Sequence, residues 1–338
     1  MDSRPIQYRL LTGFDDPLIG AQAWNDLVRS GSTDVLFLTF EYQKCWWEVF
    51  GRGQLLLIAA FRHEQLLAIA PLFTDGAMIY FVGSGGSDYL DFIGLMNGEL
   101  LRGMMRLAGE QVSGLLGFRF YHLPENSDTQ DLLASVASYN ELELYEEQSW
   151  PCPRLEVSRC PEHALDATRK KSLLRHQAWF DGSGEIKVEH MHEAVAISPH
   201  LDEFFDQHIR RWAATDYPSL FLDPDQQLFY QRLCEALTPN GWLRFTRIIH
   251  QGRSIAYHFG FNYCGSFLWY KPSFEITLAK HGPGEVLIRH LILRAIEEEA
   301  HTFDFGLGDE AFKQRFATNS IRVNDYGLYP KNEKTHAA

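Results

Sequence analysis

The clearest hydrophobic pattern lies near the C-terminal end of the chain, where apolar residues recur with helical spacing. They occupy positions 287, 288, 291, 292, 295 and 296, which predicts a helix over residues 286–300 packed against a sheet. An aromatic strand ending at Trp269 and Tyr270 precedes this helix, and residues 303–306 restart a strand after it. The turn at residues 281–284 is rich in glycine. The segment therefore predicts a strand–turn–helix–strand unit.

Similar patterns divide the rest of the chain into two comparable halves. Expected helices cover residues 21–30, 40–50, 100–114, 163–180, 198–215 and 224–237. Expected strands cover residues 55–61, 66–73, 78–82, 117–123, 242–249 and 254–263. Three prolines interrupt the periodicity at residues 148–161. We therefore expect an α/β (α+β) fold with two domains, residues 1–150 and 151–330, and a loose tail at residues 331–338.

The glycine-rich turn before the helix at 286–300 is a candidate anion site. A turn of this kind leaves backbone N–H groups unpaired beside the positive end of the helix dipole, which suits a diphosphate. Glycines that only shape a turn explain the same pattern equally well. Residues 83–86 of the first half are also glycine-rich, but no helix is expected directly after them.

Composition and net charge limit the classes of binding partner and the cellular location that we expect for this protein. The 338 residues carry a net charge of -13, which disfavours a nucleic-acid-binding surface, although local basic patches remain able to hold a phosphorylated ligand. No apolar run approaches the ~20 residues of a membrane helix, and the first residues lack the apolar core of a signal peptide. The five cysteines stand singly, which suits a reducing cytoplasm and gives no thiolate metal site. We expect a cytoplasmic protein without membrane insertion; the sequence makes no prediction about oligomeric state.

Short motifs along nearly the whole chain resemble those of the CelD/BcsL-type acyltransferases, a branch of the GNAT superfamily. The first half contributes WWEVFG (46–51), AIAPL (68–72) and DYLDFI (88–93). The second half contributes RKKSLLR (169–175), HIRRW (208–212), PG and VL at 283–284 and 286–287, and FDFGLGDEAFKQRF (303–316). The resemblance implies two tandem GNAT-like domains, each a mixed and mostly antiparallel sheet flanked by helices. The Fem-type peptidoglycan aminoacyltransferases share this arrangement.

GNAT enzymes bind acyl-coenzyme A (acyl-CoA) through a glycine turn and the helix that follows it. The resemblance therefore implies cofactor contacts from the turn and the start of the helix, namely Lys280, Gly282, Pro283, Gly284, Glu285 and Val286. Here a proline stands between the two glycines, and proline removes one N–H donor. Weaker cofactor binding or a different acyl carrier would follow from that change.

Acyl transfer to an amine needs a base, donors for the oxyanion and an acid for the leaving group. His208 lies on the apolar face of its helix, where a hydrogen-bonded core histidine is as good an interpretation as a catalytic base. Its resemblance to the H-x-x-R-W motif favours a substrate-facing group with Arg211 and Trp212. Tyr270 is a candidate acid, although an aromatic residue at a strand end usually packs. Lys313 resembles a lysine shared with the Fem-type enzymes and is expected in the active cleft; a lysine that snorkels to the surface is the alternative.

Further candidates are polar residues in glycine-rich or basic segments. Asp88, Tyr89 and Asp91 follow the first-half glycines and are expected to contact the acceptor, or else to cap the next element. The basic segment at residues 169–175 is interpreted mainly as a solvated helix face, with phosphate binding as the alternative. His190 and His192 form an H-x-H pair, but no third ligand stands at a recognisable spacing, so no metal site is expected.

The leading hypothesis is an acyl-CoA-dependent N- or O-acyltransferase that acts on a sugar, a sugar nucleotide or an amine in cell-envelope or exopolysaccharide (including cellulose) biosynthesis. The alternatives are a transferase that uses aminoacyl-tRNA, as in the Fem type, and a non-catalytic scaffold of a polysaccharide-synthesis system. We expect His208, Arg211, Asp88, Asp91 and Lys313 to converge on one cleft.

Overall fold

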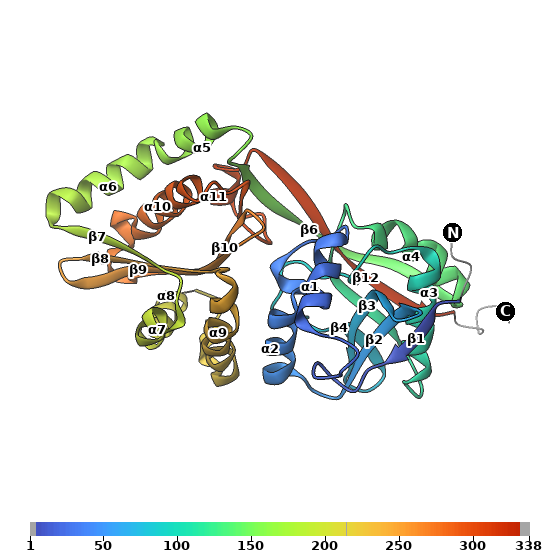
Figure 1. The fold of residues 1–338 in the computed structure, drawn as a ribbon. Helices are drawn as coiled ribbons and strands as arrows, with labels where there is room; N and C mark the ends of the chain where they lie inside the picture. The colour runs from blue at the N-terminus through green and yellow to red at the C-terminus, as the bar shows by residue number, and fades with distance from the viewer. Residues whose placement is uncertain (1–4, 214, 332–338) are drawn as a thin grey trace. The chain divides into compact units, whose positions relative to one another are not determined.

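The computed structural model describes residues 5–213 and 215–331 (Figure 1). Its strands are β1 (Gln7–Leu10), β2 (Gln54–Arg62), β3 (Gln65–Thr74), β4 (Met78–Phe81), β5 (Gly117–Pro124), β6 (Leu142–Glu156), β7 (Ile186–Met191), β8 (Leu243–His250), β9 (Arg253–Tyr263), β10 (Ser266–Phe274), β11 (Thr302–Asp304) and β12 (Asn319–Pro330). Its α-helices are α1 (Ala21–Ser30), α2 (Phe40–Phe50), α3 (Gly98–Glu110), α4 (Asp128–Tyr139), α5 (Pro161–Thr168), α6 (Lys171–Ser183), α7 (Ala194–Ile197), α8 (Leu201–Trp212), α9 (Pro224–Leu237), α10 (Pro283–Glu297) and α11 (Ala311–Gln314). The expected tail at residues 331–338 lies outside the described residues, apart from Lys331.

The chain divides into two compact units. Unit 1 comprises Met1–Pro151 and Ile321–Ala338, and unit 2 comprises Cys152–Ser320. The hydrogen-bonded strand order is β1-β2-β3-β4-β5-β12-β6-β11-β10-β9-β8-β7, so β12 lies between β5 and β6. Residues 321–330, which the sequence analysis grouped with the second half, therefore belong with the first. A strand that returns from the far end of the chain leaves no local signal of where it pairs.

In unit 1, helices cover both faces of a mixed sheet. Strands β1 to β4 pair antiparallel with their neighbours, and β4 pairs parallel with β5 after the crossover through α3. Phe73 of β3 packs against Trp46 and Trp47 of α2. Phe118 of β5 points to the opposite face, where it lies beside Gly109 of α3.

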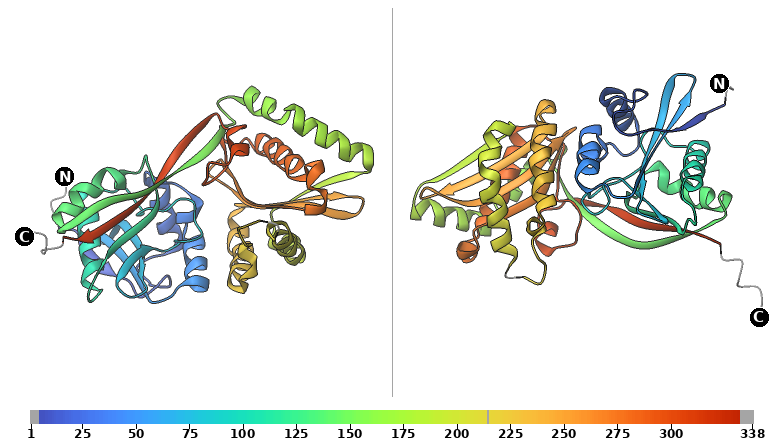
Figure 2. Two further views of the ribbon diagram at one scale, coloured as in Figure 1. Left: turned by 180° about the vertical axis from the view of Figure 1, so that it is seen from behind. Right: turned by 90° about the horizontal axis from the view of Figure 1, so that it is seen from below.

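Unit 2 repeats this order of elements. Strands β7 to β10 pair antiparallel, and β10 pairs parallel with β11 after the crossover through α10. Helices α5, α6 and α10 lie on one side of this sheet, and α7, α8 and α9 lie on the other (Figures 1 and 2). The expected mixed, mostly antiparallel sheets flanked by helices are confirmed.

Helix α10 is the central packing element of unit 2. Its buried face consists of residues at the expected helical spacing: Val286, Leu287, Ile288, Leu291, Ile292 and Ala295. They form one core with Phe267, Trp269 and Phe303 of the sheet. The helix starts at Pro283, three residues before the expected start, because proline is well suited to a first helical turn, where its missing N–H needs no partner.

The prediction of one continuous helix over residues 163–180 is wrong. Residues 163–180 do not form one helix; the chain leaves the helical conformation at Lys170, whose φ and ψ are -55° and 137°. Helices α5 and α6 therefore meet at a break that contains neither glycine nor proline. Both helices contact α10, so packing rather than local sequence sets the break.

Candidate functional site

A cavity of about 320 Å³ opens in unit 2 beside the first turn of α10. Its lining is mostly apolar, with three cationic or titratable side chains and one carboxylate among the aromatic residues. The lining residues are His176, Arg211, Trp269, Pro272, Phe274, Ala279, Gly282, Pro283, Gly284, Glu285, Leu287, Ile288, Phe312, Arg315 and Phe316. A concave apolar site with a few polar groups is the usual form of a small-molecule site.

The cavity lies where β10 and β11 separate. The two strands pair only over Ser266–Leu268 and Thr302–Asp304, whereas β10 continues to Phe274. Trp269, Pro272 and Phe274 of β10 line the cavity beyond the last paired residue. The opening is thus built into the sheet rather than formed by a surface loop.

The turn before α10 is shaped by two glycines for different reasons. Gly282 has a φ of 69°, the left-handed region that favours glycine, and a Cβ there would lie 2.2 Å from Nδ1 of His176. A Cβ at Gly284 would lie 3.1 Å from the ring of Phe274, at the cavity wall. Both positions therefore require a residue without a side chain for close packing.

The N-terminus of α10 offers few free donors. The N–H groups of Glu285 and Val286 donate to the carbonyl of Gly282, at 2.9 and 3.1 Å, and Pro283 has no N–H. Among the described residues, the structure records no acceptor for the N–H of Gly284. A diphosphate at this position would therefore meet one free N–H rather than several.

Glu285 places a carboxylate at the same helix end. Its two oxygens contact Nδ1 of His176 at 3.1 Å and the guanidinium of Arg315 at 2.9 Å. Burial raises the pKa of Glu285, but hydrogen bonds from Arg315 and Ser172 outweigh burial, so the net pKa is lowered. The carboxylate is thus charged and clamps α6 and the segment after α11 to α10.

Arg211 is the uncompensated charge of the cavity. Its NH1 donates to the carbonyl of Pro272 at 2.7 Å, and its guanidinium carbon lies 4.4 Å from the ring centroid of Phe274. Among the described residues, no carboxylate lies within ion-pair distance of it. Burial lowers its pKa to about 10, so it remains protonated at neutral pH. A buried cation without a counter-ion is costly unless a ligand supplies the anion.

His208, the expected base, lies in the core of unit 2. Trp212 donates its indole N–H to Nε2 of His208 at 3.0 Å, and Nδ1 lies 2.8 Å from the hydroxyl of Ser219. Burial, followed by the charge of Arg211, lowers its pKa to about 3. His208 is 4% exposed and does not line the cavity. The structure therefore shows the alternative that the sequence left open, a hydrogen-bonded core histidine that orients Trp212.

The other two expected catalytic residues lie close to the cavity but not on its wall. Tyr270 packs against Tyr230 and Phe261, on the opposite face of β10 from Trp269. Lys313 is 4% exposed, donates to the carbonyl of Leu307 at 2.6 Å and pairs with Glu310 at 2.8 Å. Its neighbours Phe312 and Arg315 do line the cavity. The catalytic roles of both residues stay predictions.

The cofactor residues expected from the sequence are mostly brought together. Gly282, Pro283, Gly284 and Glu285 line the cavity, whereas Val286 is buried beneath it and Lys280 is exposed outside it. The sequence analysis missed His176, which directly follows the basic segment at residues 169–175, and Arg315, which stood unremarked in the FKQRF motif.

The expected acceptor residues lie in unit 1. Asp91 is 1% exposed and accepts hydrogen bonds from Thr33 at 2.6 Å and Ser127 at 2.5 Å. Burial raises its pKa, and hydrogen bonds oppose the rise. Tyr89 is also buried, 6.1 Å from the ring of Phe37, whereas Asp88 is half-buried. Asp91 therefore ties loops together within unit 1, and the expected convergence of these residues with those of unit 2 stays a prediction.

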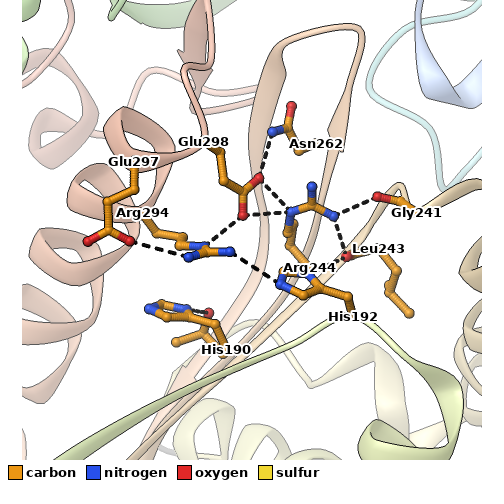
Figure 3. Close-up of polar contacts among 10 residues, drawn as sticks. His190, His192, Gly241, Leu243, Arg244, Asn262, Arg294, Glu297 and Glu298 are labelled. Carbon is orange, nitrogen blue, oxygen red and sulfur yellow. Dashed lines mark hydrogen bonds and ion pairs between the residues drawn. The ribbon is translucent and has the colours of Figure 1, made fainter.

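The two histidines of the H-x-H pair join a polar network at the other end of α10 (Figure 3). His190 contacts Thr246, and Nε2 of His192 lies 3.4 Å from Arg294. Arg244 lies beside them, and cations of this kind disfavour a metal ion. Among the described residues, no group of three His, Cys, Asp or Glu side chains is arranged to hold a metal. No helix within the described ranges is long and apolar enough to cross a membrane.

Comparison with known proteins agrees with this geometry. Residues 167–314, which include α6, α10 and most of the residues that line the cavity, match the family described as acetyltransferase (GNAT) domain. This region of unit 2 is thus similar to a GNAT-type acetyltransferase domain. Among curated protein sequences, none matches the chain.

Solved structures share the fold over nearly the whole chain. FemX, at 11% identity, covers 93% of this chain and 97% of its own, with a TM-score of 0.67. A conserved protein of unknown function from Bacteroides thetaiotaomicron, at 14% identity, covers 97% of this chain and 100% of its own, with a TM-score of 0.59. A tandem GNAT protein from the clavulanic acid biosynthesis pathway, at 11% identity, covers 98% and 100%, with a TM-score of 0.54. At these identities the likeness shows the fold alone, and the narrower CelD/BcsL assignment stays a prediction.

Proposed function

We propose that unit 2 is an acyltransferase domain whose cavity beside α10 binds an acyl donor, with acyl-CoA as the first candidate. The observation that carries this proposal is the separation of β10 from β11 next to the glycine turn. A thioester arm would enter the opening in the sheet, and its anionic part would lie toward Arg211 and Arg315. The acceptor would be a sugar, a sugar nucleotide or an amine of envelope or exopolysaccharide biosynthesis, as the sequence resemblance implies, and the reaction would take place in the cytoplasm.

Each named residue has a distinct part in this proposal. Gly284 allows the donor to approach the backbone, and Arg211 supplies the buried positive charge that stabilises an anionic group of the ligand. His208 acts through Trp212 as a positioning residue rather than as the base. Lys313 would have to exchange its present partners for a reacting oxygen in order to stabilise an oxyanion.

A second candidate function has a specific observation in its favour. The turn before α10 has one free N–H, a proline and a paired carboxylate, which together suit a diphosphate poorly. An acyl donor without a diphosphate at this position, such as an aminoacyl ester of tRNA, would avoid that conflict. The net charge of -13 weighs against a tRNA partner. A ligand-binding scaffold without catalysis is the third possibility.

Ligand-dependent thermal stabilisation tests the proposal. Acetyl-CoA and longer acyl-CoA thioesters should raise the melting temperature of the full chain, and Gly284→Trp should abolish the shift because the indole would fill the cavity beside Phe274. A control variant, Gly182→Trp, changes a glycine that has open space around it. If no acyl-CoA at millimolar concentration shifts the melting temperature, the donor assignment fails, and an aminoacyl donor is tested next.

A further inference from the structure

A row of tyrosines crosses one face of the sheet in unit 1. Tyr80 of β4, Tyr121 of β5, Tyr329 of β12 and Tyr145 of β6 stand on four strands that are neighbours in the sheet. We call these residues, with Arg119 and Glu147 between them, the tyrosine strip. Strands β12 and β6 lie side by side in every view (Figures 1 and 2). Gly327 pairs with Arg119, so Tyr329 lies opposite Gly117, four residues along β5 from Tyr121, and the strip runs obliquely across the strands.

The side chains of the strip lie on the same face of the sheet as Phe73, which packs against α2, and the strip begins beside that contact at Tyr80. Tyr80 and Gly327 are both in register with Arg119, so these positions share one face. Side chains on the opposite face, Phe118 and Leu328, are 2% and 0% exposed. Tyr145, in contrast, is 50% exposed, and Tyr80, Tyr121 and Tyr329 are half-buried.

The strip is held rigid by contacts among its own members. The rings of Tyr80 and Tyr121 are parallel, with centroids 6.4 Å apart, and the guanidinium carbon of Arg119 lies 5.2 Å from the centroid of Tyr121. Arg119 Nε donates to Glu147 at 2.8 Å. The hydroxyl of Tyr329 donates to the other oxygen of Glu147.

Gly327 makes room for this arrangement. A Cβ at this position would lie 2.5 Å from Oε1 of Glu147 and 2.6 Å from the hydroxyl of Tyr329. The glycine therefore lets the carboxylate and the phenol lie close to the sheet, between the rings. Because rigid groups lose little entropy on binding, such a surface is preorganised for a flat ligand.

The chemistry of the strip limits what it can bind. Tyrosine rings offer apolar faces for C–H groups, and the carboxylate, guanidinium and phenol groups offer hydrogen bonds at the ring edges. Arg119 is already neutralised by Glu147, and Glu143 accepts from the hydroxyl of Tyr145 at 2.6 Å. The local charge is therefore negative, which disfavours phosphates and other anions. A neutral ligand with apolar ring faces and many hydroxyls fits best.

We propose that the tyrosine strip is a binding surface for a neutral oligosaccharide chain, with sugar rings stacked on the two tyrosine pairs at its ends, Tyr80 with Tyr121 and Tyr329 with Tyr145. The surface lies in unit 1 and is independent of the acyltransferase proposal for unit 2. A saccharide bound here would be recognised whether or not unit 2 transfers an acyl group, so either proposal can fail without the other.

Calorimetric titration of the full-length chain with neutral glucose oligomers of one to six units tests this surface. Affinity should rise with oligomer length until the strip is filled and then level off. Tyr121→Ala and Tyr329→Ala should each weaken binding by at least about tenfold. Tyr121→Phe keeps the ring and should bind nearly as well as the wild type. Normal binding by this variant would show that a substitution at residue 121 does not in itself unfold the surface.

Tyr139→Ala is the matched control, because Tyr139 is 65% exposed on α4 and lies outside the strip. It should bind like the wild type. The proposal is overturned if no neutral oligomer binds at millimolar concentration, or if Tyr121→Ala and Tyr329→Ala bind unchanged. It is also overturned if only a cationic glucosamine oligomer binds, because the surface would then recognise positive charge.

Discussion

At the scale of single residues, the structure reassigns two neighbours of the HIRRW motif. His208 is buried with both ring nitrogens hydrogen-bonded, whereas Arg211 faces the cavity with donors to spare. A helical pattern shows that both side chains point inward from α8, but it does not show which of them ends at a cavity. The motif therefore places one residue, Arg211, at the cavity and another, His208, in the core, and the functional role of α8 stays a prediction.

Replacement of Arg211 should have opposite effects on binding and on stability. Arg211→Met removes a charge-assisted contact to an anionic ligand, which should weaken acyl-CoA binding by about 10- to 150-fold, equivalent to ~1.5–3 kcal/mol. The same change removes a buried cation without a counter-ion, so the free energy of unfolding should stay equal or rise. Calorimetry and urea unfolding measure the two quantities.

The neighbouring arginine provides the control for that experiment. Arg210 is 53% exposed and lies 3.9 Å from Glu275. Arg210→Met should change binding by less than about fivefold, because exposed ion pairs contribute ~0–1 kcal/mol. A marked loss of stability in Arg211→Met, or equal binding losses in both variants, would contradict the anion-receptor role.

At the scale of elements, α10 is fixed at both ends by charged groups. Glu285 anchors its first turn to α6, and Glu298, just after the helix, receives hydrogen bonds from Arg244, Arg294 and Asn262, all at 2.7 Å (Figure 3). Glu298 is largely buried, with 11% of its side chain exposed. The helix that forms the cavity wall is therefore held in place by its C-terminal network as well as by its apolar face.

Loss of the Glu298 carboxylate should destabilise unit 2. Glu298→Ala removes the acceptor of Arg244 Nε and of the Asn262 amide, and breaking a buried ion pair in this way costs about 3–5 kcal/mol. Glu297→Ala is the matched control, since Glu297 is 63% exposed and pairs with Arg294 at 3.3 Å; it should cost less than about 1 kcal/mol. Urea unfolding compares the two. Similar losses in both variants would show that the network does not anchor α10.

The sequence predicted elements better than it predicted their breaks and partners. Helix α10 and the hairpin of β8 and β9 follow from strong periodicity. The break between α5 and α6 has no local signal. The role of His176 depends on contact with Gly282, more than 100 positions along the chain. Contacts at such separations are set by packing, which no local pattern encodes.

At the scale of the whole molecule, the chain does not finish unit 1 before it begins unit 2. After unit 2 it returns to unit 1, which a simple division into two consecutive halves does not predict. The last strand, β12, completes the sheet of unit 1 between β5 and β6. A chain that ends at residue 320 should therefore leave β5 and β6 unpaired along that edge and should fail to fold unit 1. A chain that ends at residue 331 keeps β12 and is the control. Hydrogen exchange that remains protected in β5 of the shorter chain would contradict this prediction.

Acid should destabilise the two units differently. Burial lowers the pKa of His208 and His258 to about 3 and that of His190 and His290 to about 4, and all four lie in unit 2. In the unfolded chain a histidine titrates near its ordinary 6.5. Below that pH the unfolded state binds more protons than the folded state, so the stability of unit 2 should fall as pH drops from about 6.5 toward 4, by up to ~1.4 kcal/mol per pH unit for each histidine.

One buried group of unit 1, Asp91, should respond in the opposite direction over the acidic part of this range. Burial raises the pKa of Asp91 there, so the folded state takes up a proton at a higher pH than the unfolded chain does, and this group favours folding as pH falls.

Hydrogen exchange followed by mass spectrometry between pH 7 and 4, corrected for the intrinsic exchange rate, should show protection lost in β8 and β9 before it is lost in β2 and β3. His258→Gln should flatten the loss in unit 2, because the amide does not titrate. Simultaneous loss of protection in both units would show that the buried histidines do not govern acid stability.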